Sequence, residues 1–176
     1  WFLKPEKDFT LTSILNQIKA IKQRYGLEYF VIDAWNKIEH ADDKTSYIGK
    51  CLDEIVTFCE INNVHCFLVA HPTKIKKNMN TGKYEVPTLY DIAGSANFYN
   101  KADNGICVYR DFEEQKTYVH IQKIKFDHWG TESCAVFTYD VKSKRYQSDT
   151  PDLGSWLNPK SLYNEMIEYV NGKPKE

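Results

Sequence analysis

The stretch YFVIDAWN, from Tyr29 to Asn36, decides the fold, because it is an apolar run that ends on a carboxylate. A continuous run of apolar and aromatic residues is typical of a strand buried on both faces of a parallel sheet. Asp33, at the end of this strand, has two interpretations. It is a capping or turn aspartate, or it is a carboxylate that the strand presents to a magnesium ion.

The segments around this strand predict a parallel α/β core. They follow one another as the end of a strand (WFL, 1–3), a helix from Thr10 or Thr12 to Gly26, the strand at Tyr29, a helix from about Ser46 to Asn62 and the run VHCFLVA (64–70). This β-α-β-α-β order, with strands too apolar for an open antiparallel sheet, predicts parallel pairing. Ligands of such sheets bind at the carboxyl ends of the strands, which is where Asp33 and His71 stand.

The second half of the chain predicts an antiparallel addition to the parallel sheet. After the loop 72–87, which has no periodicity, come a short helix (DIAGSANFYNKAD), a strand (GICVYRD), and two strands at Thr117–Lys125 and Cys134–Tyr139 joined as a hairpin across Gly130. One domain over 1–150 is expected, followed over 151–176 by a linker and an amphipathic helix from about Ser161 to Val170.

Composition excludes several classes of protein. The 176 residues carry a net charge of −1, so any binding of nucleic acid depends on a local basic patch. The five cysteines show no CxxC spacing, and those inside apolar runs read as reduced core residues, which suits a reducing cytosol. No apolar run reaches the roughly 20 residues that span a bilayer, and no signal peptide is recognised. The start at Trp1, without Met, indicates the inside of a longer protein.

Three groups of residues are candidates for chemistry. His71 follows the second parallel strand and could donate a hydrogen bond to a γ-phosphate, or it is a loop histidine without a role. The loop cations Lys74, Lys76, Lys77 and Lys83 suit the phosphates of a nucleic acid strand, or they are a solvated surface. Lys123 and Lys125, two apart on a strand, share one face and either meet an anion or face solvent at a sheet edge.

Other catalytic signatures are missing from the sequence. It contains no HExxH or GxSxG motif, and its histidines have no metal spacing with the cysteines, which argues against a zinc site and a serine hydrolase. It also contains no GxxxxGK[ST], so the phosphate-binding loop of nucleotide hydrolases is absent from these residues.

Taken in order, the motifs resemble the second half of a RecA-like ATPase core, as found in ring-forming replicative helicases of the DnaB and Twinkle kind, including phage primase-helicases. YFVIDAWN resembles their Walker B strand, and FLVAHPTK resembles the strand that ends in a Gln or His sensor. IAGSANFYNKADNGICVYRD is similar to their glycine-serine segment, helix, Ala-Asp pair and strand, with Ala102 and Asp103 as the pair. QKIKFDHWGT resembles their Lys-x-Arg strand. The resemblance covers about Ile21 to Tyr139.

The resemblance implies a role for each candidate. Asp33 holds Mg²⁺, probably the kind of contact made through water, His71 senses the γ-phosphate of ATP, and the lysine loop holds single-stranded DNA in the centre of a ring. Lys123 matches the lysine of the family strand, and Lys125 stands where the family has an arginine finger that acts on the neighbouring subunit. A lysine lacks the planar fork of arginine, so a weaker stabilisation of the transferred phosphate is expected.

The resemblance thus implies part of the motor of an ATP-dependent replicative DNA helicase or primase-helicase. Its implied partners are single-stranded DNA, copies of itself in a homohexameric ring and a primase domain upstream, in a bacterial or phage-infected cytoplasm and without a membrane. With the Walker A loop and catalytic glutamate expected before Trp1, the chain alone should not hydrolyse ATP. The alternatives are a RecA-like recombinase or signalling ATPase, a degenerate module that binds DNA or a partner, and a plain structural domain.

Overall fold

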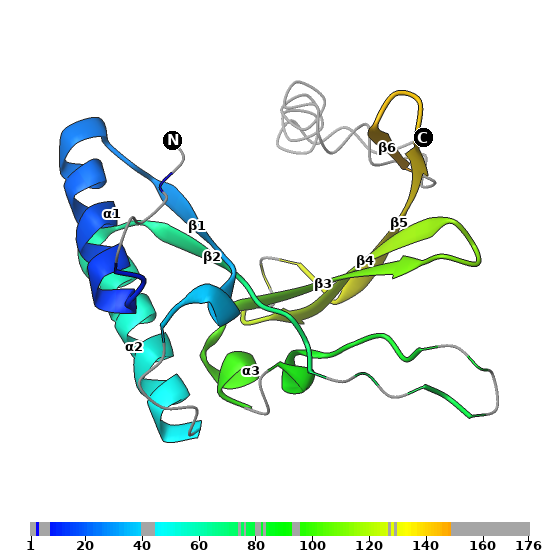
Figure 1. Cartoon of the computed structure of the whole chain (residues 1–176), viewed down its shortest axis with the longest axis horizontal. Helices are drawn as coiled ribbons and strands as arrows, with labels where there is room; N and C mark the ends of the chain where they lie inside the picture. The colour runs from blue at the N-terminus through cyan, green and yellow to red at the C-terminus, as the bar shows by residue number, and fades with distance from the viewer. Residues whose placement is uncertain are drawn as a thin grey trace, which may run out of the picture.

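The computed structural model describes residues 3, 8–39, 45–73, 75, 77–79, 82, 84–92, 96–126, 128 and 130–148. Its elements, drawn in Figure 1, are α1 Leu11–Tyr25, β1 Tyr29–Asp33, η1 Trp35–Lys37, α2 Thr45–Asn62, β2 His65–Val69, η2 Leu89–Asp91, α3 Asn97–Lys101, β3 Asn104–Asp111, β4 Lys116–Ile124, β5 Ser133–Asp140 and β6 Arg145–Ser148. The helix expected near Ser161–Val170 lies outside the described residues, and so does most of the strand expected at 1–3. Its one described residue, Leu3, is not in a strand.

Helix α1 begins and ends where its capping residues predict. The Thr10 hydroxyl accepts a hydrogen bond from the backbone N–H of Ser13 at 3.3 Å, which satisfies one of the free amides of the first turn. Gly26 follows the last turn with φ 74°, and its N–H donates to the Lys22 carbonyl at 2.9 Å. Only glycine adopts this left-handed conformation without steric cost, so Gly26 fixes the point where the chain turns toward β1.

Strands β1 and β2 pair in parallel, as predicted, with Tyr29 opposite His65 and Asp33 opposite Val69. The expectation that β1 is buried on both faces is wrong for this chain. Phe30 and Ile32 are buried, whereas Val31 is 58% exposed on the opposite face. The reason is that the buried residues of α1 and α2 both pack in one cluster with Phe30 and Ile32, so the described helices cover only this face.

The predicted hairpin is present as β4 and β5, but it belongs to a larger sheet. The order is β3-β4-β5-β6, all antiparallel, with a bulge where Gly105 gives way to Ile106. The sequence did not predict β6. Among the described residues no ladder joins this sheet to the β1–β2 pair, so the parallel and antiparallel parts are two sheets rather than one extended sheet. The mixed α/β class is confirmed.

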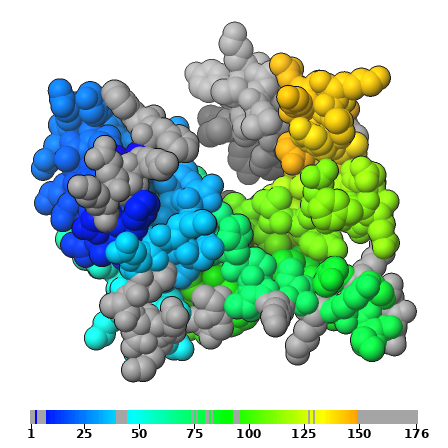
Figure 2. Space-filling model, in the orientation of Figure 1, coloured from blue at the N-terminus to red at the C-terminus, as the bar shows by residue number. Residues whose placement is uncertain are grey.

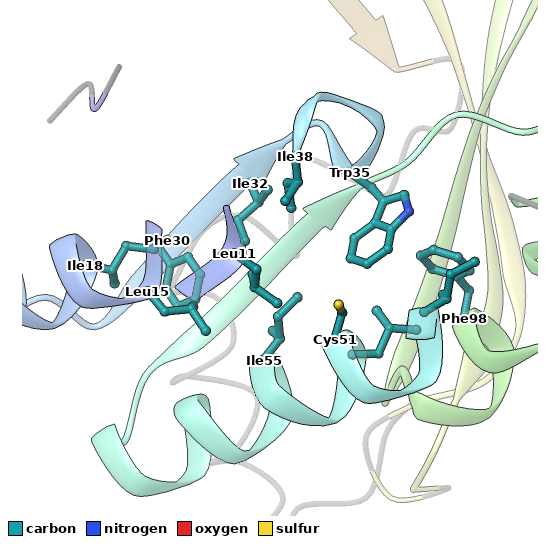
Figure 3. Packing of buried hydrophobic residues seen from close by; sticks show 12 residues of the cluster. Leu11, Leu15, Ile18, Phe30, Ile32, Trp35, Ile38, Cys51, Ile55 and Phe98 are labelled. Carbon is teal, nitrogen blue, oxygen red and sulfur yellow. The ribbon is translucent and has the colours of Figure 1, made fainter. Parts of the chain in front are cut away.

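The hydrophobic core lies on the helical side of the parallel pair (Figure 3). Its buried members are Leu11, Leu15, Ile18, Phe30, Ile32, Trp35, Ile38, Ile48, Cys51, Leu52, Ile55 and Phe98. Trp35 and Phe98 meet edge to face with ring centroids 5.5 Å apart, and this contact ties η1 to α3. In Figure 2 the blue and cyan surface over this core stands beside the green to orange surface of the antiparallel sheet. No described residue of β3 to β6 belongs to the buried cluster.

Candidate functional site

The carboxyl edge of the parallel pair carries the two residues singled out from the sequence. Asp33 is the last residue of β1, and its Cα partner Val69 is the last residue of β2, two positions before His71. Both Asp33 and His71 are exposed to solvent. The register therefore puts a carboxylate and an imidazole at the same edge of the sheet, on neighbouring strands. This is the arrangement that the order of the elements predicted.

A single carboxylate limits which metal ion suits this edge. Among the described residues no group of three or more histidine, cysteine, aspartate or glutamate side chains could hold a metal ion. Structural zinc, which takes four protein ligands, does not fit such an edge. Magnesium fits, because it keeps several waters and usually takes one or two carboxylates beside the phosphates of a substrate. Asp33 is the residue that would hold it here.

The cysteine next to this edge is not a nucleophile. Cys66 lies in β2, and burial raises the pKa of its thiol to about 12, with the neighbouring Cys59 as a smaller cause. A thiol with this pKa stays protonated at neutral pH, and the thiolate is the reactive form. The described structure thus agrees with a reduced cysteine in the core.

The lysine loop is a tied arm, which Figure 1 draws extending away from the helices. At its base the N–H of Thr73 donates to the Asp91 carbonyl at 2.7 Å, and Pro72 bridges to Ile92. Further out, Lys77 bridges to Tyr84, and the Lys77 ammonium lies 5.8 Å from the centroid of the Tyr84 ring. We call residues 72–87 the arm. Of its four candidate lysines, Lys77 is described and exposed, whereas Lys74, Lys76 and Lys83 lie outside the described residues.

A groove of about 600 Å³ runs between the arm and β3. Lys77 and Tyr84 line it on the arm, and Arg110 and Phe112 line it at the far end of β3. Neither Asp33 nor His71 lines this groove, although Ala70 and Pro72, on either side of His71, do. The groove and the carboxyl edge are therefore separate sites that meet at the start of the arm.

Lys123 and Lys125 contact groups of their own chain. The Lys123 ammonium donates to the Tyr99 carbonyl and lies 4.7 Å from the centroid of the Tyr99 ring. The Lys125 ammonium pairs with Asp103 at 2.6 Å, so the anion expected across from these lysines is the aspartate of the Ala-Asp motif. Both side chains of this pair are about half exposed, which makes the pair weak and exchangeable. In the part of the chain that the structure describes, no hydrogen bond or ion pair joins either lysine to Asp33 or His71.

Sequence reasoning missed the aromatic residues of the groove and of the sheet beside it. The missed residues are Tyr84, Arg110, Phe112, Tyr139 and Tyr146. Their signal was available, because rings and cations alternate in YRDF (109–112) and in TYDVKSKRY (138–146). The pattern was not recognised because these rings come together only when β3 and β5 join one sheet.

Comparisons with known proteins agree with this architecture. The chain is 33% identical over 147 residues to the Arabidopsis thaliana protein named Twinkle homolog protein, chloroplastic/mitochondrial; the match covers 78% of this chain and 20% of that protein. The chain thus spans about a fifth of the relative's length. No family model matches the chain.

A solved structure of a helicase ATPase domain has the same fold. It superposes with a TM-score of 0.64 at 15% identity, over 78% of this chain and 50% of that one. Among the described residues no helix is long and apolar enough to cross a membrane. The fold, the order of the motifs and the Twinkle homolog agree, and the chain accordingly belongs to the DnaB/Twinkle kind of RecA-like helicase domains.

Proposed function

We propose that this chain is part of the motor domain of an ATP-dependent replicative DNA helicase or primase-helicase, in which ATP hydrolysis drives movement along single-stranded DNA. The observation that carries the proposal is the shared edge of Asp33 and His71, at the carboxyl ends of two parallel strands. The match to a protein named as a Twinkle homolog supports it. The proposal requires a phosphate-binding loop, which these 176 residues lack, from another part of the whole protein.

In the proposed mechanism the residues of this edge bind and position. The carboxylate of Asp33 orients the water molecules around Mg²⁺, which supplies positive charge to the phosphates of ATP. The imidazole of His71 donates a hydrogen bond to the γ-phosphate. Because His71 immediately precedes Pro72 at the base of the arm, the loss of that hydrogen bond after hydrolysis is passed to the arm through the backbone. The lysines of the arm contact the phosphates of the DNA strand.

Lys123 and Lys125 act across a subunit interface in this proposal, within a homohexameric ring. Lys125 must exchange its carboxylate partner Asp103 for the phosphate of the neighbouring subunit. A half-exposed ion pair contributes about 1 kcal/mol or less, so this exchange costs little. Lysine supplies a point charge rather than the planar fork of arginine, and the proposal therefore includes slow turnover. A bacterial or phage-infected cytoplasm is the proposed location; the name of the relative places that protein in chloroplasts and mitochondria.

The test uses Asp33→Asn and His71→Ala in the parent protein that the proposal requires. Both variants should lower the rate of ATP turnover at least tenfold while single-stranded DNA binding without nucleotide stays within twofold, because the loss of a positioned charge or donor costs on the order of 10² in rate. Lys37→Ala, an exposed change two residues after Trp35, is the matched control. Unchanged turnover in both variants would reject the ATPase proposal.

A degenerate module that binds DNA or a partner without catalysis is the second candidate. The observation that favours it is the Lys125–Asp103 pair, which neutralises the residue in the position of the arginine finger. The two candidates differ in the effect of Asp103→Asn on the parent protein. Release of Lys125 should raise or preserve the stimulation of ATP turnover by DNA in a motor, and it should change nothing in a degenerate module.

A further inference from the structure

Four residues form an exposed cluster of rings around one arginine at the far end of the antiparallel sheet. We call Arg110, Phe112, Tyr139 and Tyr146 the ring patch. The guanidinium carbon of Arg110 lies 5.0 Å from the centroid of the Phe112 ring and 5.9 Å from that of Tyr139. Tyr139 and Tyr146 are cross-strand partners with centroids 5.0 Å apart. Phe112 is 70% exposed and Tyr146 is 56% exposed, so the cluster offers its rings to solvent.

The turn beside the ring patch is rich in cations. Lys142, Lys144 and Arg145 lie in or next to the turn between β5 and β6, and all are exposed. Asp140, the acidic residue of this turn, is engaged by the turn itself. It accepts hydrogen bonds from the Ser143 hydroxyl at 2.7 Å and the Lys142 N–H at 2.9 Å. In the described residues no ion pair involves any of the three cations. Positive charge thus borders a flat surface of rings.

The groove between the arm and β3 connects the ring patch to the arm. Lys77 and Tyr84 line the groove at one end, and Arg110 and Phe112 line it at the other. We propose that a single strand of nucleic acid follows this groove from the arm to the ring patch, where its bases stack on the exposed rings and its phosphates contact the cations of the β5–β6 turn. The surface is distinct from the arm and from the carboxyl edge, and it would lengthen the footprint of the strand on each subunit.

The chemistry of the surface favours a single strand over other macromolecules. Unpaired bases stack on aromatic rings and on guanidinium planes, and every base has a face to offer. A duplex hides these faces, so it could use the cations but not the rings. An acidic protein segment could also use the cations, but it gains nothing specific from ring faces that are already spaced by an arginine. The alternation of exposed rings and exposed cations therefore selects an unpaired strand.

The test measures fluorescence anisotropy of a labelled oligodeoxythymidylate of about 20 nucleotides, longer than the 4–16 nucleotides of a typical single-strand site, at low salt with the full 176-residue chain. Tyr146→Ala and Arg110→Ala should each weaken binding roughly tenfold, the expected effect of losing one stacking partner. Tyr146→Phe keeps the ring and should bind like the wild type. Tyr25→Ala is the matched control, because Tyr25 is 49% exposed and Arg24 lies 5.3 Å from its ring, on α1 and away from the groove.

Each outcome decides between the surfaces. If Lys77→Ala weakens binding and the two patch variants bind like the wild type, the ring patch is rejected while binding by the arm stands. If the patch variants weaken binding and Lys77→Ala does not, the ring patch binds the strand and the role of the arm is rejected. Equal competition by a duplex or by polyglutamate, with Tyr146→Ala unchanged, would show a surface for any polyanion and would reject the proposal. An oligoribonucleotide of the same length tells RNA from DNA.

Discussion

The parallel pair and the antiparallel sheet are stabilised by different means. Strands β1 and β2 are only two, yet they support the whole buried cluster, since α1, α2 and α3 all bury side chains against them. Strands β3 to β6 form a larger ladder with no member in that cluster, and their buried residues are Thr117 and Asp111. The larger sheet therefore depends on backbone pairing and cross-strand contacts, and the smaller one on hydrophobic burial. The number of strands is a poor guide to where the stability of this chain lies.

The largest contrast is expected in the reactivity of two cysteines, Cys66 in β2 and Cys134 in β5. With a pKa of about 12, only about one in ten thousand Cys66 thiols is ionised at a pH of about 8, so Cys66 should react only when the parallel pair opens. Cys134 is exposed and should be alkylated at once. Iodoacetamide labelling followed by mass spectrometry should show at least a hundredfold difference in rate. Equal rates would mean that the parallel pair opens as readily as the antiparallel sheet.

Removal of a core ring should cost more free energy than any change on β3. Phe30 is buried on β1 and meets Phe58 edge to face at 6.0 Å, so Phe30→Ala should lower the free energy of unfolding by about 3–5 kcal/mol. Val108 on β3 is 68% exposed, and Val108→Ala should change it by about 0.5 kcal/mol or less. Urea denaturation followed by circular dichroism measures both. Similar losses in the two variants would contradict the proposed division of stability.

The antiparallel sheet has its own sensitive residue at the turn between β3 and β4. The Asp111 carboxylate is buried and accepts hydrogen bonds from the backbone N–H groups of Glu113 at 2.8 Å and Glu114 at 3.0 Å. Asp111→Ala leaves these amides without their acceptor and should cost about 1–3 kcal/mol. Asp111→Asn retains an acceptor oxygen and should lose less. Hydrogen exchange of the two amides should quicken in the alanine variant and stay nearly unchanged in the asparagine variant.

The smallest effect is expected in acid, and it compares one capping aspartate from each region. The Ser143 hydroxyl and then the Lys142 N–H lower the pKa of Asp140, and the Thr10 hydroxyl and then its N–H lower the pKa of Asp8. Because both folded-state pKa values lie below the ordinary 3.8, each carboxylate stabilises its turn above that pH and stops doing so as the pH falls through the folded-state value.

Amide exchange in the β5–β6 turn should therefore quicken below a pH of about 3.8, whereas α1, which is also held by its buried face, should stay protected. Strand β6 is exposed along its whole length, so nothing else in the described structure compensates for the loss of the Asp140 contacts. Asp140→Asn should remove the pH dependence of the turn. Simultaneous loss of protection in both regions would show that they unfold as one unit.

Sequence reasoning succeeded where the determinants are local. The ends of α1 follow from Thr10 and Gly26, whose effects reach only a few residues along the chain. The shared edge of Asp33 and His71 follows from the order of the elements, because a helix between two strands favours parallel pairing. For Lys74, Lys76 and Lys83 the roles stay predictions, since these residues lie outside the described part of the chain.

Sequence reasoning failed where partners are distant along the chain. The exposure of Val31 depends on which faces the helices cover, and nothing in YFVID states this. Strand β6 reads RYQS, a polar segment that becomes a strand only because β5 offers it an edge. The pairing of Lys125 with Asp103 joins residues 22 positions apart, and only the antiparallel ladder between β3 and β4 brings them together.

Met79, in the outer part of the arm between Lys77 and Tyr84, has a side chain that is 95% exposed. The sequence contains 2 methionines, Met79 and Met166, so selective methyl labelling gives a two-line NMR spectrum of which one line belongs to the arm. Exposed methyl groups reorient within picoseconds to nanoseconds, and immobilisation broadens and shifts their signals. The chain thus carries a built-in spectroscopic reporter, and its line width can be followed while a nucleic acid is added without any foreign dye.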